Sequence, residues 1–156
     1  MPVKNEKIHT HYEEVDGHGR DVYHTTIADL PSLEDKCVAI TGCTSGVGYW
    51  AALAMAEKGA KCLILLNRPS ERADAAVKMV QEASTPNSEV LFIPCDLTDF
   101  DSVKEAAKKV KAKASECGGL DALGLNAAVM AVPDVRTKNG ASERRLNVVC
   151  PGVVSV

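Results

Sequence analysis

Residues 41–48 read T-G-C-T-S-G-V-G, directly after the apolar run at 37–40 and directly before an alanine-rich segment. The three glycines let the backbone turn sharply and leave the main chain bare, so that a phosphate group can approach it. The segment after them is predicted to be a helix, whose first N–H groups and positive dipole end would point at that anion. The stretch therefore predicts a strand, a phosphate-binding turn and a helix, in that order.

Strand and helix continue to alternate outward from this turn. The expected strands are Cys37–Thr41, Lys61–Leu66, Glu89–Pro94 and Leu120–Leu125, and the expected helices are 47–58, 70–83 and 98–117. Thr98-x-x-Asp101 resembles a capping box for the last of these helices, and glycines close the first and the last. Repeats of this length predict a parallel sheet with right-handed crossovers, hence strand order 3-2-1-4 with helices on both faces.

The two ends of the chain differ from this pattern. Residues 1–35 are expected to be a polar arm of little periodicity, and residues 36–156 a partial Rossmann-like domain of class α/β. Residues 131–145 are polar and turn-rich, and 146–150 are predicted to be one late strand that stops at the following Pro-Gly. The expected sheet is therefore incomplete at its C-terminal side.

A full doubly wound domain continues with further helices that cover one face of the fourth strand, and without them its apolar residues Ala122, Leu123 and Leu125 would be exposed. Because apolar patches of this kind usually mark an interaction surface, a protein partner is predicted for this side of the sheet. The net charge of −3 and the pI of about 5.8 argue against a nucleic-acid partner.

Composition also limits the cellular setting. No apolar run is long enough to span a bilayer, and the N-terminal residues lack the apolar core of a secretory signal. The six cysteines include no Cys-x-x-Cys pair, and Cys37, Cys62 and Cys95 at the edges of expected strands are interpreted as small hydrophobes. A soluble protein in a reducing compartment, the cytoplasm or an organelle interior, is expected.

The four histidines all lie in the N-terminal arm. His9-x-His11 with Glu13 and Asp16 is either a metal cluster or part of a solvated arm. Because the spacing matches no known site, no metal is predicted.

Asn67-Arg68 ends the second expected strand, about 20 residues after the last glycine, where an acidic residue would hold the ribose of NAD. Arg68 instead offers a planar guanidinium suited to a 2′-phosphate, which favours NADP. The alternative is an ordinary loop arginine.

Two more polar residues follow strands at the same predicted edge of the sheet. Asp96, followed by Leu97, can accept a hydrogen bond from an adenine amino group or can cap the next turn. Asn126, followed by Ala127, can bridge strand backbones and frame a cofactor, or can be a plain turn residue. The sequence leaves both pairs of alternatives open.

Together the segments T-G-C-T-S-G-V-G, L-N-R, C-D-L and L-N-A-A resemble the short-chain dehydrogenase/reductase family over residues 36 to about 138. The N-A-A-V-M ending and residues 137–140 are most similar to the branch that contains retinol dehydrogenases and light-dependent protochlorophyllide reductases. The resemblance implies a Rossmann fold, a nicotinamide cofactor and hydride transfer to or from a carbonyl, alcohol or conjugated double bond. By position it also implies a set of cofactor-binding residues. These are Gly42, Ser45, Gly46, Val47, Gly48, Asn67, Arg68, Asp96, Leu97, Asn126 and Ala127, with Ala128 in place of the family's usual glycine.

The family's catalytic pair, Tyr-x-x-x-Lys, has no counterpart in these 156 residues. In that pair the lysine lowers the pKa of a tyrosine that acts as acid and base. Tyr12, Tyr23 and Tyr49 are followed four positions later by aspartate, isoleucine and leucine. No catalytic residue is therefore predicted.

The C-terminal residues explain this absence. Residues 145–154 look like the strand and Pro-Gly loop that follow the family's catalytic helix, and 137–143 look like the segment before its catalytic strand. We therefore expect a truncated or internally deleted member of the family. A rival alignment places Asn147 in the helix before the catalytic strand, but it leaves Pro151-Gly152 unexplained.

Three functional hypotheses follow. The first is an NADP-binding oxidoreductase by family that is inactive or impaired as this chain. The second is a non-catalytic nucleotide-binding or structural subunit docked in a larger assembly. The third is a truncated product without a stable role of its own.

Overall fold

The computed structural model describes residues 18–128 and 152–155, and its contacts divide the chain into two compact units, 1–31 and 32–156. The described part of the first unit is helix α2 (His18–Asp29). The sequence predicted no helix there, because this segment has no clear apolar stripe at helical spacing. Within the described residues, no helix is both long enough and apolar enough to cross a membrane.

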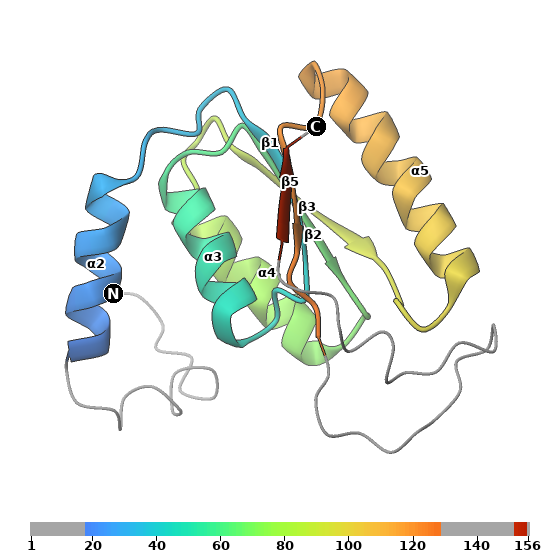
Figure 1. Ribbon diagram of the computed structural model, residues 1–156, viewed down its shortest axis with the longest axis horizontal. Coiled ribbons are helices and arrows are strands. Elements are labelled where there is room, and N and C mark those ends of the chain that lie inside the picture. The colour runs from blue at the N-terminus through green and yellow to red at the C-terminus, as the bar shows by residue number, and fades with distance from the viewer. Residues whose placement is uncertain (1–17, 129–151, 156) are drawn as a thin grey trace. The chain divides into compact units, whose positions relative to one another are not determined.

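The second unit is built on a five-stranded sheet with the order β3-β2-β1-β4-β5 (Figure 1). The strands are β1 (Cys37–Thr41), β2 (Cys62–Asn67), β3 (Glu89–Pro94), β4 (Ala122–Leu125) and β5 (Gly152–Ser155). The first four are parallel, and Val38 of β1 lies between Leu63 of β2 and Ala122 of β4. The predicted order 3-2-1-4 is confirmed.

Strand β5 lies beyond the predicted late strand, in a segment where no strand was predicted. It covers residues that were expected to follow the last strand, and it runs antiparallel to β4, with Leu125 opposite Gly152. The segment predicted as the late strand, 146–150, lies outside the described residues. Antiparallel pairing needs no crossover helix, because the chain has only to return at the edge where β4 ends.

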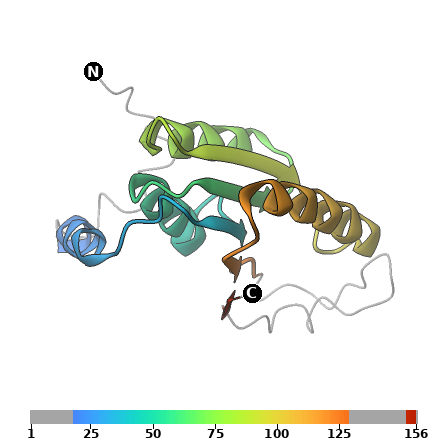
Figure 2. The same ribbon diagram turned by 90° about the horizontal axis from the view of Figure 1, so that it is seen from above.

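Three helices cover the two faces of the sheet. Helices α3 (Gly46–Glu57) and α4 (Glu71–Ala83) lie on one face, and α5 (Phe100–Cys117) lies on the other (Figures 1 and 2). The predicted start of α4 is confirmed, because the Ser70 side chain accepts a hydrogen bond from the Ala73 N–H at 3.1 Å.

The predicted capping box of α5 is wrong by one residue. The helix is capped by Asp99, whose carboxylate accepts hydrogen bonds from the backbone N–H groups of Asp101 and Ser102. Thr98 does not cap the helix, because its N–H and hydroxyl both donate to Asp96. An aspartate one residue later provides the same cap that the sequence pattern assigned to Thr98.

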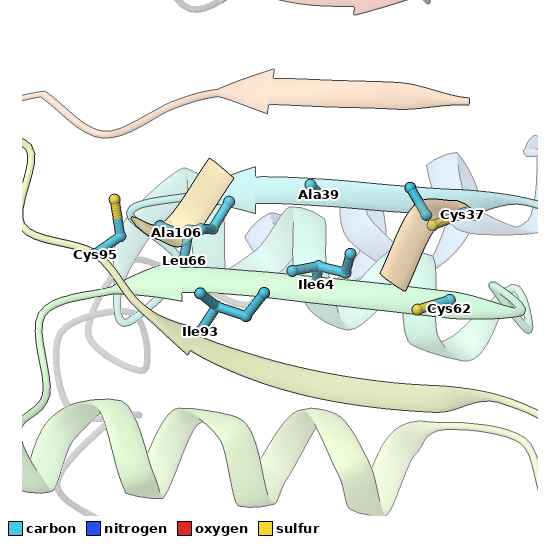
Figure 3. Packing of buried hydrophobic residues seen from close by; sticks show 9 residues of the cluster. Cys37, Ala39, Cys62, Ile64, Leu66, Ile93, Cys95 and Ala106 are labelled. Atoms are coloured by element: carbon cyan, nitrogen blue, oxygen red, sulfur yellow. The ribbon is translucent and has the colours of Figure 1, made fainter. Parts of the chain in front are cut away.

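The core on the α5 side consists of small and medium apolar side chains (Figure 3). Its buried members are Cys37, Ala39, Cys62, Ile64, Leu66, Ile93, Cys95, Ala106 and Ala114. Alternate residues of β1 and β2 point to the opposite face, where α3 and α4 lie, so that both strands are buried on both sides. This is why these two strands appear in the sequence as unbroken apolar runs.

Candidate functional site

The glycine-rich turn is packed tightly against the end of β4. A Cβ atom on Gly42, which has a φ of 71°, would lie 2.6 Å from the Cα of Ala127. A Cβ on Gly48 would overlap the Asn126 side-chain nitrogen and the Gly42 carbonyl oxygen. By contrast, Gly46 has open space around it and needs glycine only for its φ of 60°. The backbone is therefore bare at Gly42 and Gly48 because their surroundings leave no room for a side chain, and at Gly46 because of its positive φ.

Thr41 ties the end of β1 to the end of β4. Its hydroxyl oxygen accepts hydrogen bonds from the N–H groups of Asn126 and Ala127, at 3.1 and 3.0 Å. The hydroxyl also donates to the Gly124 carbonyl at 3.4 Å. The sequence analysis did not predict this role. The only signal for it was that Thr41 directly precedes the first glycine of residues 41–48.

Asn126 forms the bridge between strands that was one of its two predicted roles. Its Nδ2 atom donates to the carbonyl oxygens of Thr41 and Gly42, at 3.1 and 2.9 Å. The Asn126 side chain therefore holds the start of the glycine turn against the end of β4. This bonding also explains why Gly48 cannot carry a side chain, since Asn126 occupies that space.

Asn67 supports the turn from the other side. Its Oδ1 accepts a hydrogen bond from the Cys43 N–H at 3.0 Å, and its Nδ2 lies 2.8 Å from the Cys43 sulfur. The side chain is buried. Asn67 was predicted as a cofactor-binding residue, and its side chain is directed at the turn itself. Its partner Cys43 is a second residue whose role the sequence analysis did not predict.

Helix α3 begins at the turn with an open N-terminus. Ser45 is its N-cap, with an extended φ of −165°, and the serine side chain makes no capping hydrogen bond. The first turn holds no acidic residue. Val47 is 78% exposed although it is apolar. Unsatisfied N–H groups and the positive end of the helix dipole therefore face outward beside the bare glycines, an arrangement that suits an anion.

Arg68 and Asp96 lie at the same carboxyl edge, because β2 and β3 pair with Asn67 opposite Pro94. Oδ1 of Asp96 accepts hydrogen bonds from the N–H and the hydroxyl of Thr98, at 2.9 and 2.8 Å. These bonds hold the pKa of Asp96 below its usual value, and the charge of Arg68 adds a smaller effect in the same direction. The turn-capping role of Asp96 is thus observed, and its second oxygen can still accept a hydrogen bond.

An apolar cavity of about 450 Å³ lies between α5 and the sheet. At the carboxyl edge it is lined by Leu97, which follows Asp96, and it extends along α5 beside Leu123 and Leu125 of β4. The fourth strand is half-buried at Ala122, Leu123 and Leu125. Its apolar side chains therefore border a hollow on this face.

No tyrosine of the described part of the chain is suited to acid–base catalysis at this edge. Tyr49 lies in α3, is 2% exposed, and burial raises the pKa of its hydroxyl. A catalytic tyrosine needs the opposite shift. Tyr23 belongs to α2, in the other unit, and Tyr12 lies outside the described residues.

Residues 36–156 match the family model described as short chain dehydrogenase. An uncharacterised oxidoreductase of Schizosaccharomyces pombe is 36% identical over 74% of this chain and 32% of its own length. The human polyprenol dehydrogenase is 34% identical over 73% of this chain and 33% of its own length. The chain thus spans about a third of the length of these curated relatives.

Solved structures agree with this match. A short-chain type dehydrogenase/reductase from Mycobacterium ulcerans superimposes with a TM-score of 0.57 at 23% identity, over 64% of this chain and 35% of that one. An NAD⁺-bound xylitol dehydrogenase superimposes with a TM-score of 0.53 at 27% identity, over 62% of this chain and 35% of that one.

Proposed function

The chain belongs to the short-chain dehydrogenase/reductase family of oxidoreductases, and on this premise we propose that it binds NADP at the carboxyl edge of its sheet without catalysing hydride transfer by itself. The observation that carries the proposal is the bare glycine turn held between Asn126 and Asn67. Gly42 and Gly48 have no room for side chains, and the N-terminus of α3 beside them has neither a side-chain cap nor an acidic residue. A pyrophosphate can lie against such a surface without steric conflict.

Each part of the dinucleotide has a candidate residue at this edge. The pyrophosphate would lie over Gly42, Gly46 and Gly48, beside the Ser45 hydroxyl, and would cover the exposed Val47. The adenine would lie near Asp96 and Leu97. Asn126 and Ala127 would border the nicotinamide side. When bound, the cofactor supplies the hydride chemistry of the family, and the residues of this chain bind and orient it.

Arg68 supports NADP over NAD. Arg68, directly after β2, would lie beside the adenosine ribose in this arrangement, and it is an exposed cation rather than an acid. A carboxylate at this point would repel a 2′-phosphate, whereas a guanidinium can bind it through two parallel hydrogen bonds.

Replacing Arg68 by alanine is expected to weaken NADPH binding by about ten- to a hundredfold, because charge-assisted hydrogen bonds to the 2′-phosphate are lost. NADH binding should remain unchanged. Fluorescence titration of each variant with both cofactors measures the effect. Lys78→Ala is the matched control, since it also removes one exposed positive charge, on α4. Equal binding of NADPH and NADH by the parent chain would overturn the NADP assignment.

The second part of the proposal concerns turnover. With saturating NADPH and a panel of aldehydes, ketones and conjugated enones, we expect no oxidation of NADPH above the background rate. The reason is that these 156 residues hold no tyrosine with a lysine four positions later. A binding titration of the same sample with NADPH shows whether an absence of turnover is due to a missing catalytic group or to a failure to bind the cofactor. Clear, protein-dependent turnover would contradict this part and leave the cofactor site intact.

Three other expectations remain predictions. They are the division into an arm and a partial domain near residue 35, a reducing compartment, and a protein partner over the incomplete sheet. The apolar cavity beside α5 marks the place that such a partner would cover. The residues weighed as a metal cluster, His9, His11, Glu13 and Asp16, lie outside the described residues.

A further inference from the structure

Three cysteines from different elements meet at the end of the sheet opposite the glycine turn. Cys37 begins β1, Cys62 begins β2, and Cys117 is the last residue of α5. Their sulfur atoms all lie within 4.8 Å of one another. Cys37 and Cys62 are directly paired in the parallel register, and Figure 3 shows both at the same end of the two strands. The cluster is therefore separate from the proposed cofactor site, which lies at the carboxyl ends of the same strands.

The spacing of the sulfurs is close to that of a metal–thiolate site. A metal ion bound at about 2.3 Å from each of three sulfurs in one plane holds them about 4 Å apart. Sulfurs already within 4.8 Å need a shift of less than one ångström to reach this geometry. Two of the three residues are fixed by the hydrogen bonds of the sheet, so most of the site is organised before any ion arrives.

The surroundings of the cluster offer partial access to an ion. Cys37 and Cys62 are buried, whereas Cys117 is only half-buried and leaves a route for an ion. Around the rim, the Lys61 ammonium donates to the Cys117 carbonyl at 3.3 Å. Asp121 accepts the Cys37 N–H at 2.8 Å and pairs with Lys36 at 3.0 Å. Lys36, Lys61 and the Asp121 carboxylate, which pairs with Lys36, thus lie around the cluster.

We propose that Cys37, Cys62 and Cys117 form a three-sulfur site for Cu⁺. Soft thiolate ligands select Cu⁺ and Zn²⁺ among the common ions. Zn²⁺ in structural sites takes four ligands, whereas three sulfurs complete the coordination of Cu⁺. Binding replaces S–H bonds by metal–sulfur bonds and releases the protons to solvent, with no change in oxidation state.

The test uses the full chain with reduced thiols, kept under anaerobic conditions. Cu⁺ is supplied as its complex with bicinchoninate, whose colour falls as the protein takes the ion. We expect one equivalent of Cu⁺ to move to the protein, with the ultraviolet absorption of copper–thiolate bonds. We expect Cys117→Ala to lose this equivalent. Cys95→Ala, which removes a buried thiol of the same core outside the cluster, should retain it.

A second measurement needs no variant. In the parent chain, bound Cu⁺ should protect Cys117 from alkylation by iodoacetamide, as read by mass spectrometry of peptides. Failure of the parent chain to compete with bicinchoninate would overturn the proposal. The proposal would also be overturned if the Cys117→Ala chain still took up one equivalent of copper. The same holds if the parent chain bound one equivalent of Zn²⁺ and no Cu⁺. Neither measurement uses NADPH, so the outcome is independent of the cofactor proposal.

Discussion

Replacing Gly48 by alanine is expected to lower the free energy of unfolding by about 1–3 kcal/mol, the usual range for overpacking a filled site. The same change should abolish NADPH binding. The added methyl group would overlap the Asn126 nitrogen and the Gly42 carbonyl oxygen, so that the turn and the end of β4 must move apart. Urea denaturation followed by circular dichroism gives the stability, and fluorescence titration gives the cofactor binding.

Gly118→Asn is the control for this substitution. Gly118 caps α5 with a φ of 98°, has open space around it, and accepts asparagine at a small energetic cost. The Gly118→Asn chain should bind NADPH as tightly as the parent chain does. A Gly48→Ala chain of parental stability and affinity would show that the turn adapts easily, and the proposed reason for its bare backbone would fail.

Thr41→Val is expected to destabilise the chain by about 2 kcal/mol or more, because two backbone N–H groups lose their acceptor in a buried place. These are the N–H groups of Asn126 and Ala127. Valine keeps the volume of threonine, so the loss reports on hydrogen bonding rather than on packing. Denaturation in urea measures it.

Thr41→Ser provides the matched comparison. Serine keeps the hydroxyl and removes one methyl group, which is worth about 1 kcal/mol in a buried position. Serine should therefore be the milder change, even though it creates more empty space. The reverse order would mean that packing, not the hydroxyl, joins the ends of β1 and β4.

The sequence predicted all four parallel strands, two of them with the observed bounds. Cys37–Thr41 and Glu89–Pro94 have the expected bounds, since a glycine or a polar segment delimits each run. Helix α2 was missed because it lacks an apolar stripe. The pairing of β5 was not predictable, because a strand's residues do not state which neighbour it joins, or in which sense.

The candidate site was predictable in part. The glycines predict a turn without side chains. The order of the strands then places Arg68 and Asp96 at the same edge of the sheet as this turn. The hydrogen bonds of Thr41 to Asn126 and of Cys43 to Asn67 were not predictable, because each joins residues far apart along the chain. The three-cysteine cluster had no signal at all. Its members are widely separated in sequence, and only the parallel register and the end of α5 bring them together.

Strand β5 determines which backbone groups form the open edge of the sheet. Without it, the outer side of β4 would present a row of unpaired N–H and C=O groups, a template onto which a strand of another molecule can add. β5 pairs with all four residues of β4, from Ala122 to Leu125. Residues 152–155 thus move the open edge of the sheet from β4 to β5, a strand of only four residues, and a short edge gives another molecule little backbone to pair with.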